Sequence, residues 1–583
     1  MRNILKIITK EVFIRMVVWA TALIFHLSLN AQPPAKPDYP KGYFRNPLTV
    51  AIDLSGNFGE LRPNHYHMGL DLKTLKRENL QIHAAAEGYI AKVKIEPGGF
   101  GRAIYINHPN GFTTLYAHLN NFAPALEAYI KREQYRLESW RIFIEIPPDL
   151  FPVKKGEFIA FSGNTGGSQA PHLHFEIRRT VDDVNLNPLL FGFSLQDNTP
   201  PKITRLAIYD RTKSTYEQSA RIIPVKATGA AAYTTILPVI TVNTPLVSLG
   251  ITAFDSHSGS SNQNGIFEST LSMDGESFIM FQMDEISYND TRYMNAHIDY
   301  KTKITGGYYI QHLSDLPGYV NSIYTRSKGD GTLDIGDGEI HDIRIEVKDA
   351  YGNTSVVSGK VKYTAPSMVE RVPPPDKIFY PLMVDGYETE NCEFFIGERC
   401  LYDSVRIKYS QGQSAGLEAI SDVHSIGSST IPLHDSFLIR IRPNQAIPEE
   451  QKGSTVMQWF SGARKDVVKA DWQNGWASAK FRDFGFFHLI VDQVPPVIVP
   501  LGFPDGSNLS KATRISFIVT DNLGRFKNVR AELDGKWLRF TNDKGRTFTY
   551  YFDEKCLSGQ HELRISAEDE AGNKTEKIYR FNR

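Results

Sequence analysis

Apolar and polar residues alternate along most of this chain with the period of two that is typical of β-strands. Residues 88–93, 103–106 and 172–178 show this alternation, and Gly-containing turns separate such segments. Residues 124–141 are an exception, because their apolar positions recur at the three- to four-residue spacing of a helix with charges between them. We therefore predict a mostly β protein with one helical insertion in its N-terminal third.

Start and stop signals recur in the second half of the chain and divide it into domains. Residues 199–365 and 491–583 both open at a Pro-Pro pair and close near a D-x-x-G-N turn that follows an alternating strand. This pattern resembles bacterial immunoglobulin-like domains, which implies β-sandwiches in both ranges. Residues 366–490 are also β-like, begin near a run of three prolines, and form a β domain of unknown type.

The N-terminus has the pattern of a secretory signal. A basic region is followed by an apolar run over 16–29 and by a small residue, Ala31, at a plausible cleavage point. This run of about 14 residues is short for a membrane span of about 20, although an uncleaved N-terminal anchor is the alternative. We predict a signal peptide over 1–31, a Pro-rich linker over 32–43, and an exported chain without a membrane span in its mature part. Its location would be the periplasm or cell envelope of a bacterium, or the medium.

Composition excludes some classes of protein. The formal charge of the 583 residues is zero, so no basic field indicates nucleic acid. The 27 Tyr and 34 Phe suit several β-rich cores. Among the three cysteines, Cys392 and Cys400 are close enough in sequence to form a disulfide in an oxidising compartment, and free thiols are the alternative.

Two short strings carry metal-ligand residue types. His67 and Asp71 are four residues apart, and His172 and His174 are two apart, so in extended segments each pair points to one side. Gly69, between the first pair, disfavours a helix there. Two His and one Asp would leave the fourth position of a tetrahedral zinc site open, which is the arrangement of catalytic rather than structural zinc.

With the segments around these strings, residues 44–193 resemble the lysostaphin/LytM-type zinc endopeptidases, which cut peptide cross-links in bacterial cell walls. A lone H-x-x-x-D or H-x-H is a weak signal, but the motifs occur together and in order. They are Phe58–Arg62, His67-x-x-x-Asp71, Thr114–Leu119, Val153–Gly156, Ser162–Gly166 and Pro171–Arg178. The resemblance implies a small, open antiparallel sheet with a groove over it.

The resemblance also implies residue roles. His67, Asp71 and His174 would bind one Zn²⁺, and His118 and His172 would be the catalytic histidines beside the zinc-activated water. Zinc lowers the pKa of its water to about 7, one imidazole can pass a proton to the leaving amine, and a second can stabilise charge. Which histidine is the principal base stays open. Peptide bonds of peptidoglycan stems or cross-links would be the substrate.

Several alternatives remain at this point. His65 could compete with His67 as a ligand, although its spacing to Asp71 does not match the family. Residues 330–337 hold three aspartates without the spacing of an EF-hand, so a solvated loop is favoured over a calcium site. Compared with compact relatives, residues 120–152 are an insertion, which we expect to form a wall or lid beside the groove.

Three other functions compete with a cell-wall endopeptidase. Some relatives have lost zinc ligands and regulate other cell-wall hydrolases without catalysis, but here all the ligand positions are filled. The chain could instead be an envelope assembly protein whose C-terminal β domains bind an envelope protein partner. A secreted protease acting on proteins is the third.

Overall fold

The computed structural model describes residues 39–319, 322–366, 377–414 and 418–583. The predicted signal peptide over 1–31 and most of the predicted linker over 32–43 lie outside these residues. Strands make up 47% of the structure and helices 8%, which confirms the mostly β fold class. Among the described helices, none has the length and apolar character needed to cross a membrane.

The first domain (residues 54–191) contains two antiparallel sheets that share one hydrophobic core. Along the strand β13, Leu173, Phe175 and Ile177 are fully buried in this core, and the alternate residues face the other way. The main sheet has the order β1 (Leu54–Gly56), β4 (Leu70–Lys73), β13 (His172–Arg179), β8 (Phe112–Ala117), β7 (Arg102–Asn107), β6 (Gly88–Ile95) and β10 (Ile142–Glu145), and the smaller sheet has the order β5 (Gln81–His83), β12 (Phe158–Ser162) and β9 (Leu119–Phe122).

The helical insertion is present as α2 (Pro124–Leu137). Proline suits the first helical turn, and the helix ends where Glu138 adopts a left-handed conformation with φ of 47°. Residues 139–141, which the spacing predicted as helical, therefore lie beyond the observed helix, and the chain continues into β10, which pairs with β6. Leu126 and Ile130 bury one face of α2 against the core of the first domain.

The second domain (residues 202–363) continues from the first without a break in hydrogen bonding, because β14 (Asn185–Leu186) pairs with β22 (Glu285–Ile286). Its strands join in one sheet, with short helices η3 (Tyr288–Tyr293), α3 (Met294–His297) and α4 (Tyr300–Ile304) at one end. The main path is β23 (Gln311–His312), β19 (Leu246–Phe254), β15 (Lys202–Asp210), β16 (Arg221–Ala227), β17 (Ala232–Thr235), β27 (Thr354–Tyr363), β26 (Ile340–Lys348), β20 (Glu268–Met273), β21 (Glu276–Gln282) and β24 (Tyr324–Arg326).

The third domain (residues 378–491) has two five-stranded sheets. One has the order β29 (Asp385–Glu388), β30 (Cys392–Ile396), β34 (Pro432–Ile441), β38 (Trp476–Asp483) and β37 (Asp471–Gln473). The other has the order β32 (Tyr409–Gly412), β33 (Val423–Ile426), β39 (Gly485–Val491), β35 (Thr455–Ser461) and β36 (Arg464–Lys469).

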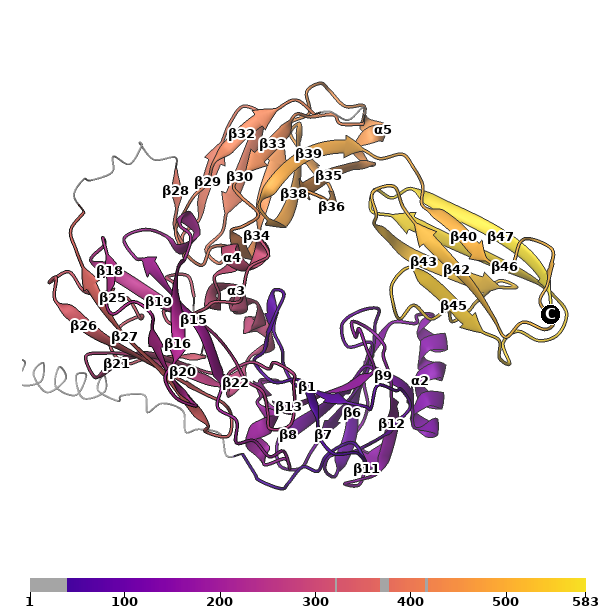
Figure 1. The fold of residues 1–583 in the computed structure, drawn as a ribbon. Helices are drawn as coiled ribbons and strands as arrows, with labels where there is room; N and C mark the ends of the chain where they lie inside the picture. The colour runs from indigo at the N-terminus through magenta and orange to yellow at the C-terminus, as the bar shows by residue number, and fades with distance from the viewer. Residues whose placement is uncertain (1–38, 320–321, 367–376, 415–417) are drawn as a thin grey trace, which may run out of the picture.

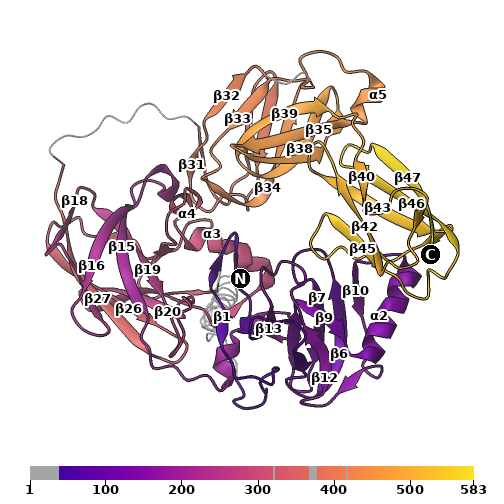
Figure 2. The ribbon, with the colours of Figure 1, turned by 45° about the vertical axis from the view of Figure 1, so that its right-hand side comes forward.

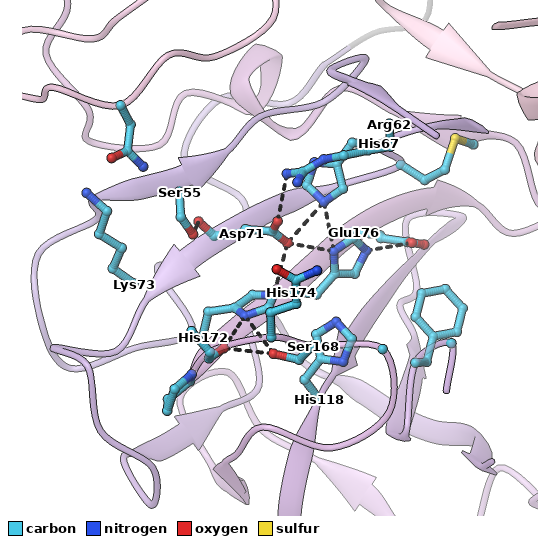
Figure 3. Close-up of a pocket in the computed structure, with 18 of the residues that line it drawn as sticks. Ser55, Arg62, His67, Asp71, Lys73, His118, Ser168, His172, His174 and Glu176 are labelled. Atoms are coloured by element: carbon cyan, nitrogen blue, oxygen red, sulfur yellow. Dashed lines mark hydrogen bonds and ion pairs between the residues drawn. The ribbon is translucent and has the colours of Figure 1, made fainter. Parts of the chain in front are cut away.

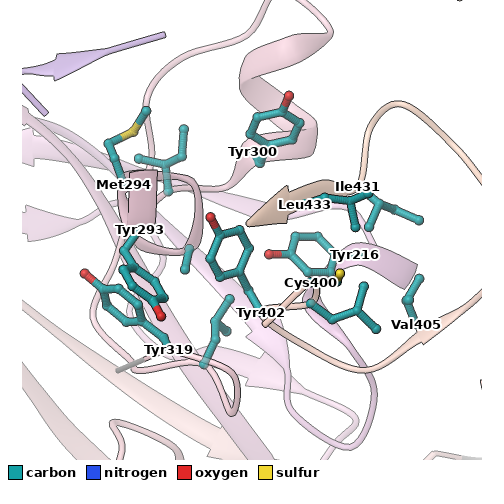
Figure 4. Close-up of a cluster of buried hydrophobic side chains, with 14 of the residues drawn as sticks. Tyr216, Tyr293, Met294, Tyr300, Tyr319, Cys400, Tyr402, Val405, Ile431 and Leu433 are labelled. Atoms are coloured by element: carbon teal, nitrogen blue, oxygen red, sulfur yellow. The ribbon is translucent and has the colours of Figure 1, made fainter. Parts of the chain in front are cut away.

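Aromatic side chains join the second and third domains into one continuous core (Figure 4). The ring of Tyr293 in the second domain packs against Tyr319 of the same domain and against Tyr402 of the third. The Tyr402 hydroxyl donates to the main-chain oxygen of Arg292 at 3.1 Å. This bond and the ring contacts tie the third domain to the second at this place.

The last domain (residues 497–582) has a three-stranded sheet of β40 (Val497–Leu501), β42 (Arg514–Thr520) and β45 (Thr547–Tyr551). Its second sheet contains β41 (Ser507–Asn508), β47 (Lys574–Asn582), β46 (Gln560–Asp569), β43 (Phe526–Leu533) and β44 (Lys536–Trp537). Buried residues of both sheets form one core. The immunoglobulin-like character of 199–365 and 491–583 stays a prediction.

The last domain returns to the first, so that the four domains are arranged around a ring (Figures 1 and 2). The contact is made with α2. Lys131 lies 2.7 Å from Asp553 and 3.0 Å from Glu554, and the Tyr135 ring packs edge-on against Trp537. Helix α2 therefore joins the first domain to the last.

All three cysteines are buried free thiols, so the disulfide considered between Cys392 and Cys400 is wrong. Cys392 begins the central strand β30, and burial raises the pKa of its thiol to about 12. The Cys400 thiol instead contacts the main chain of Gly397 and Ser436. Each sulfur is thus used for packing, in keeping with the apolar character of a buried cysteine.

Reversing the charge of Lys131 is expected to open the ring. Lys131→Glu places a third carboxylate beside Asp553 and Glu554, and like charges at this distance repel. We expect a larger radius of gyration by small-angle X-ray scattering at low salt, and its return when Asp553→Lys and Glu554→Lys are added. Lys511→Glu, the same charge change at an exposed residue of the last domain, should leave the radius unchanged. An unchanged radius for Lys131→Glu would contradict the importance of this contact.

Candidate metal centre

Pairing between β4 and β13 brings the two sequence strings together. In this antiparallel register Asp71 is directly opposite His174, so their side chains leave the sheet on one face. His67 lies in the connection between β3 (His65–Tyr66) and β4 rather than in a strand. The prediction that His67 and Asp71 point to the same side is nevertheless confirmed, because the His67 Nε2 atom lies 3.0 Å from the Asp71 Oδ1 atom.

Three possible ligand atoms converge at one point (Figure 3). His174 Nδ1 is 2.9 Å from Asp71 Oδ1 and 3.1 Å from His67 Nε2. Ligand atoms around tetrahedral zinc, at bond lengths of about 2.0–2.1 Å, are separated by roughly 3.3 Å. The donor types and their spacing therefore fit one zinc ion, bound through His67 Nε2, Asp71 and His174 Nδ1.

Neighbouring groups hold each of these side chains in the form that a metal requires. His67 Nδ1 donates to the main-chain oxygen of Asn57 at 2.7 Å, and His174 Nε2 donates to Glu176 Oε1 at 2.9 Å. Each imidazole thus keeps its other nitrogen free for a metal, and such outer partners typically raise metal affinity. Burial acts to raise the pKa of Asp71, but the imidazoles around it hold that pKa well below its usual range.

Glu176 is itself fixed by a buried network. It is fully buried, and its Oε2 accepts from Arg178 Nε at 2.7 Å and from Asn185 Nδ2 at 2.8 Å. Burial alone would raise the pKa of Glu176, yet Arg178 and His174 lower it to about 2. A buried carboxylate paired in this way stays ionised and orients His174. Glu176 was not singled out from the sequence, although its position two residues after His174 on β13 places it on the same face.

Two further imidazoles lie beside the three ligand atoms. His118 Nδ1 donates to the Thr165 main-chain oxygen at 2.9 Å, and His172 Nδ1 donates to the Ala170 main-chain oxygen at 2.8 Å. Their ring centroids are 4.8 Å apart. His172 Nε2 reaches within 3.3 Å of Asp71 Oδ1. Burial lowers the pKa of His118 to about 3, so its ring is neutral at pH 7.

Gly69 allows the backbone to approach the site closely. A Cβ atom on Gly69 would lie 2.4 Å from the Phe175 main-chain oxygen and 2.8 Å from Glu176 Cγ. These distances are too short for any side chain, so β4 could not lie against β13 with another residue here. The glycine that disfavours a helix in the sequence is thus also required by packing.

The candidate centre lies in a groove with a volume of about 1200 Å³. The first domain supplies most of its lining, including Phe100, and the second domain adds Ser261, Asn262 and Tyr288. The Phe100 and Tyr288 ring centroids are 6.3 Å apart, so they form an aromatic wall.

No residue of 120–152 lines the groove. The expected wall or lid from this insertion is therefore wrong, because α2 packs against the last domain instead.

The last domain reaches the rim of the groove through one lysine. Lys544 Nζ donates to the main-chain oxygens of Gly166 at 3.2 Å and Ser168 at 2.7 Å. Ser168 Oγ in turn lies 3.1 Å from His172 Nδ1. The turn that supports His172 is therefore held from a domain far away in the sequence.

The alternatives among the polar residues can be compared with these positions. His65 lines the groove, but its Nδ1 donates to the Pro63 main-chain oxygen and it is not part of the ligand group. The aspartates of 330–337 each accept a main-chain N–H two residues ahead, at Thr332, Gly336 and Glu339, as turn residues do.

Comparisons with known proteins agree with this geometry. Residues 65–135 match peptidase family M23, and residues 378–492 match a Zu5-like domain. The chain contains a peptidase family M23 domain. The resemblance inferred from the sequence motifs is thereby confirmed, and residues 378–492, within a region of unknown type by sequence, are similar to the Zu5-like family.

Two curated relatives illustrate the similarity of the M23 domain. An uncharacterized metalloprotease of Haemophilus influenzae is 32% identical over 158 residues, which are 26% of this chain and 27% of the relative. The DD-carboxypeptidase/endopeptidase Mpg of Neisseria meningitidis is 33% identical over 150 residues, which are 25% of this chain and 29% of the relative. The chain thus spans less than a third of the length of either relative.

Among solved structures, the catalytic domain of lysostaphin from Staphylococcus simulans is 22% identical. The match covers 24% of this chain and 91% of that domain, with a TM-score of 0.17.

A methyl group at Gly69 is expected to disrupt the centre. Gly69→Ala forces β4 away from Phe175 and Glu176, which moves Asp71 relative to His174. We expect zinc content to fall at least about 10-fold at equal total zinc, because metal sites lose affinity when their supporting contacts shift. Atomic emission spectrometry measures this on the folded protein. Gly453→Ala is the control, since Gly453 has a φ of −63° and open space at its Cβ position. Equal zinc contents would contradict the role of this close approach.

Proposed function

We propose that this protein is an exported zinc metalloendopeptidase that hydrolyses peptide bonds in peptidoglycan stem peptides or cross-links. The observation that carries the proposal is the triangle of His67 Nε2, Asp71 Oδ1 and His174 Nδ1, with separations of 2.9 to 3.1 Å, beside two further imidazoles in a groove. A structural zinc site would close its fourth position with another protein ligand. The ligand group here contains three side chains and lies in the groove.

In this proposal His67, Asp71 and His174 hold the metal. Zinc, when bound, polarises a substrate carbonyl and lowers the pKa of water to about 7. Glu176 keeps the proton of His174 on Nε2, so that Nδ1 stays available as a ligand. Arg62 donates to Asp71 Oδ2 at 3.3 Å and limits the freedom of the carboxylate.

His118 and His172 would move the protons. Both rings carry their proton on Nδ1, where a main-chain oxygen accepts it, so Nε2 is the basic atom of each. One Nε2 accepts the proton of the attacking water and later returns it to the amine that leaves. The other, once protonated, donates to the oxygen that becomes negatively charged when the carbonyl is attacked.

The groove suits an extended peptide. It is open, and it combines the aromatic wall of Phe100 and Tyr288 with charged groups of both signs, such as Lys94 and its partner Glu96. The name of the Neisseria relative, DD-carboxypeptidase/endopeptidase, supports a cell-wall substrate. Export is inferred from the signal pattern over 1–31, and the C-terminal domains would bring the enzyme to the envelope or to a protein partner there.

Digestion of purified peptidoglycan by residues 32–583 tests this proposal. We expect soluble peptides that appear only with zinc and disappear with a chelator, and mass spectrometry names the bond. His174→Ala should lose both zinc and activity. His118→Ala and His172→Ala should retain zinc, and loss of a proton-transfer group typically costs 10²- to 10⁴-fold in rate.

His65→Ala is the matched control, and it should retain zinc and activity within a few-fold. No release from the folded, zinc-loaded chain would contradict a wall endopeptidase and favour a regulator of other hydrolases. Cleavage of casein but not of peptidoglycan would instead favour a protease acting on proteins.

Removal of the Lys544 ammonium should reduce activity without loss of zinc. Lys544→Met keeps most of the apolar stem but not the two hydrogen bonds to the 166–168 turn, and charged hydrogen bonds typically contribute 1.5–3 kcal/mol. If the turn positions His172, the rate should fall on the order of 10-fold. Lys536→Met, at an exposed residue of the same domain, should have no effect. Equal rates for both variants would exclude a positioning role.

A further inference from the structure

A second group of acidic residues lies where the first domain meets the second. Asp197 follows the first domain, Asp255 follows β19, and Asp349 follows β26 in the D-x-x-G-N turn. One carboxylate oxygen of each lies within 4.8 Å of the other two. All three residues are buried, with exposed fractions of 8%, 6% and 3%.

Two of the three carboxylates are held in place by main-chain and side-chain donors. Asp349 Oδ1 accepts from the main-chain nitrogens of Tyr351 and Asn353, both at 2.9 Å. Asp197 Oδ1 accepts from the main-chain nitrogen of Thr199 at 2.9 Å. No Lys, Arg or His forms an ion pair with any of the three carboxylates in the described parts of the chain.

Asp255 carries the decisive observation. Its side chain is more than nine-tenths buried, and its Oδ1 atom has no hydrogen-bond partner among the described residues. Burial, together with the charges of Asp349 and Asp197, raises the pKa of Asp255 to about 7. A buried carboxylate with an unpartnered oxygen and no counter-charge is destabilising, and a bound cation would offset that cost.

We propose that Asp197, Asp255 and Asp349 bind a divalent cation, Ca²⁺, at the junction of the first two domains. Calcium takes six to eight oxygen ligands at about 2.3–2.6 Å, so two of its ligands can be up to about 5 Å apart. The three carboxylate oxygens meet that limit, and the absence of His or Cys from the group favours a hard cation over zinc.

The last domain repeats this arrangement. Asp492, Asp521 and Asp569 also have carboxylate oxygens within 4.8 Å of one another. Asn573 Nδ2 donates to the Asp492 main-chain oxygen at 2.9 Å, as Asn353 Nδ2 donates to that of Asp197 at 3.1 Å. Asp521 is more exposed than Asp255, so the proposal is made for the first group and the second serves as an internal comparison.

The proposed site is connected to the candidate metal centre by a short path. The segment that begins at Asp255 reaches Gly265, whose main-chain N–H and C=O both bond the Asn57 side chain at 2.8 Å. Asn57 accepts the Nδ1 proton of His67 through its main-chain oxygen. Within the same segment Asn262 lines the groove and donates to the Leu54 main-chain oxygen at 3.0 Å. A cation at Asp255 would therefore fix one wall of the groove.

Calcium titration of the full chain, with zinc content matched in all samples, tests the proposal. Isothermal titration calorimetry with calcium chloride should show binding with a Kd between about 10⁻⁶ and 10⁻³ M, and Asp255→Asn should lose one equivalent. Asp521→Asn should still bind the calcium ion that Asp255→Asn fails to bind. Asp334→Asn, at an exposed residue of the second domain, should bind as the unaltered chain does. No binding up to 10 mM, about ten times the weakest of these affinities, or full binding by Asp255→Asn, would overturn the proposal.

Thermal unfolding guards against a folding defect in the variant. The amide of Asp255→Asn removes a buried charge, so without added calcium this variant should unfold at the same temperature as the unaltered chain or higher. A calcium concentration of 1 mM is on the order of the weakest expected Kd or above it. At this concentration the unfolding temperature of the unaltered chain should rise by several degrees, and that of the variant should not. A variant that gains as much as the unaltered chain would contradict the assignment of Asp255 as a ligand.

Discussion

The Asp71 Oδ1 atom is the point on which the structure of the candidate centre depends. His67, His172 and His174 all place a ring nitrogen within 3.3 Å of it. A carboxylate oxygen surrounded by three imidazole nitrogens is suited to accept their protons or to share a positive ion with them. The β4–β13 register, the absence of a side chain at Gly69 and the Glu176–Arg178 pair all maintain this convergence.

The centre is not a property of the first domain alone. Tyr288 and Asn262 of the second domain line the groove, and Lys544 of the last domain holds the turn beside His172. The β14–β22 pairing and the shared aromatic core make the first three domains continuous. Substrate selection would therefore depend on how the domains meet, and compact relatives with only the first domain would lack this wall.

Local patterns predicted the centre well, whereas distant contacts could not be read from them. His67, Asp71, His172 and His174 come together because strand alternation and one strand pairing place them on a single face. Glu176 shares a face with His174 through the same alternation, but nothing in the local sequence marks it as the partner of the His174 ring. Tyr288 and Lys544 reach the site through domain packing, which leaves no periodic signal in the sequence.

The helical insertion was predicted from its spacing, but its partner surface on the last domain was not. The D-x-x-G-N turns were recognised as strand boundaries, yet nothing local shows that Asp349 meets Asp197 and Asp255.

The contact between α2 and the last domain has a consequence for affinity. It contains partly exposed ion pairs, a hydrogen bond from Arg539 to Gln134, and the packing of the Tyr135 ring against Trp537. Exposed ion pairs contribute only about 0–1 kcal/mol each. Because both surfaces belong to one chain, each meets the other at an effective concentration that is typically in the millimolar range for tethered partners. The last domain is thus a tethered ligand of the first, and the tether adds to the affinity that the contact itself supplies.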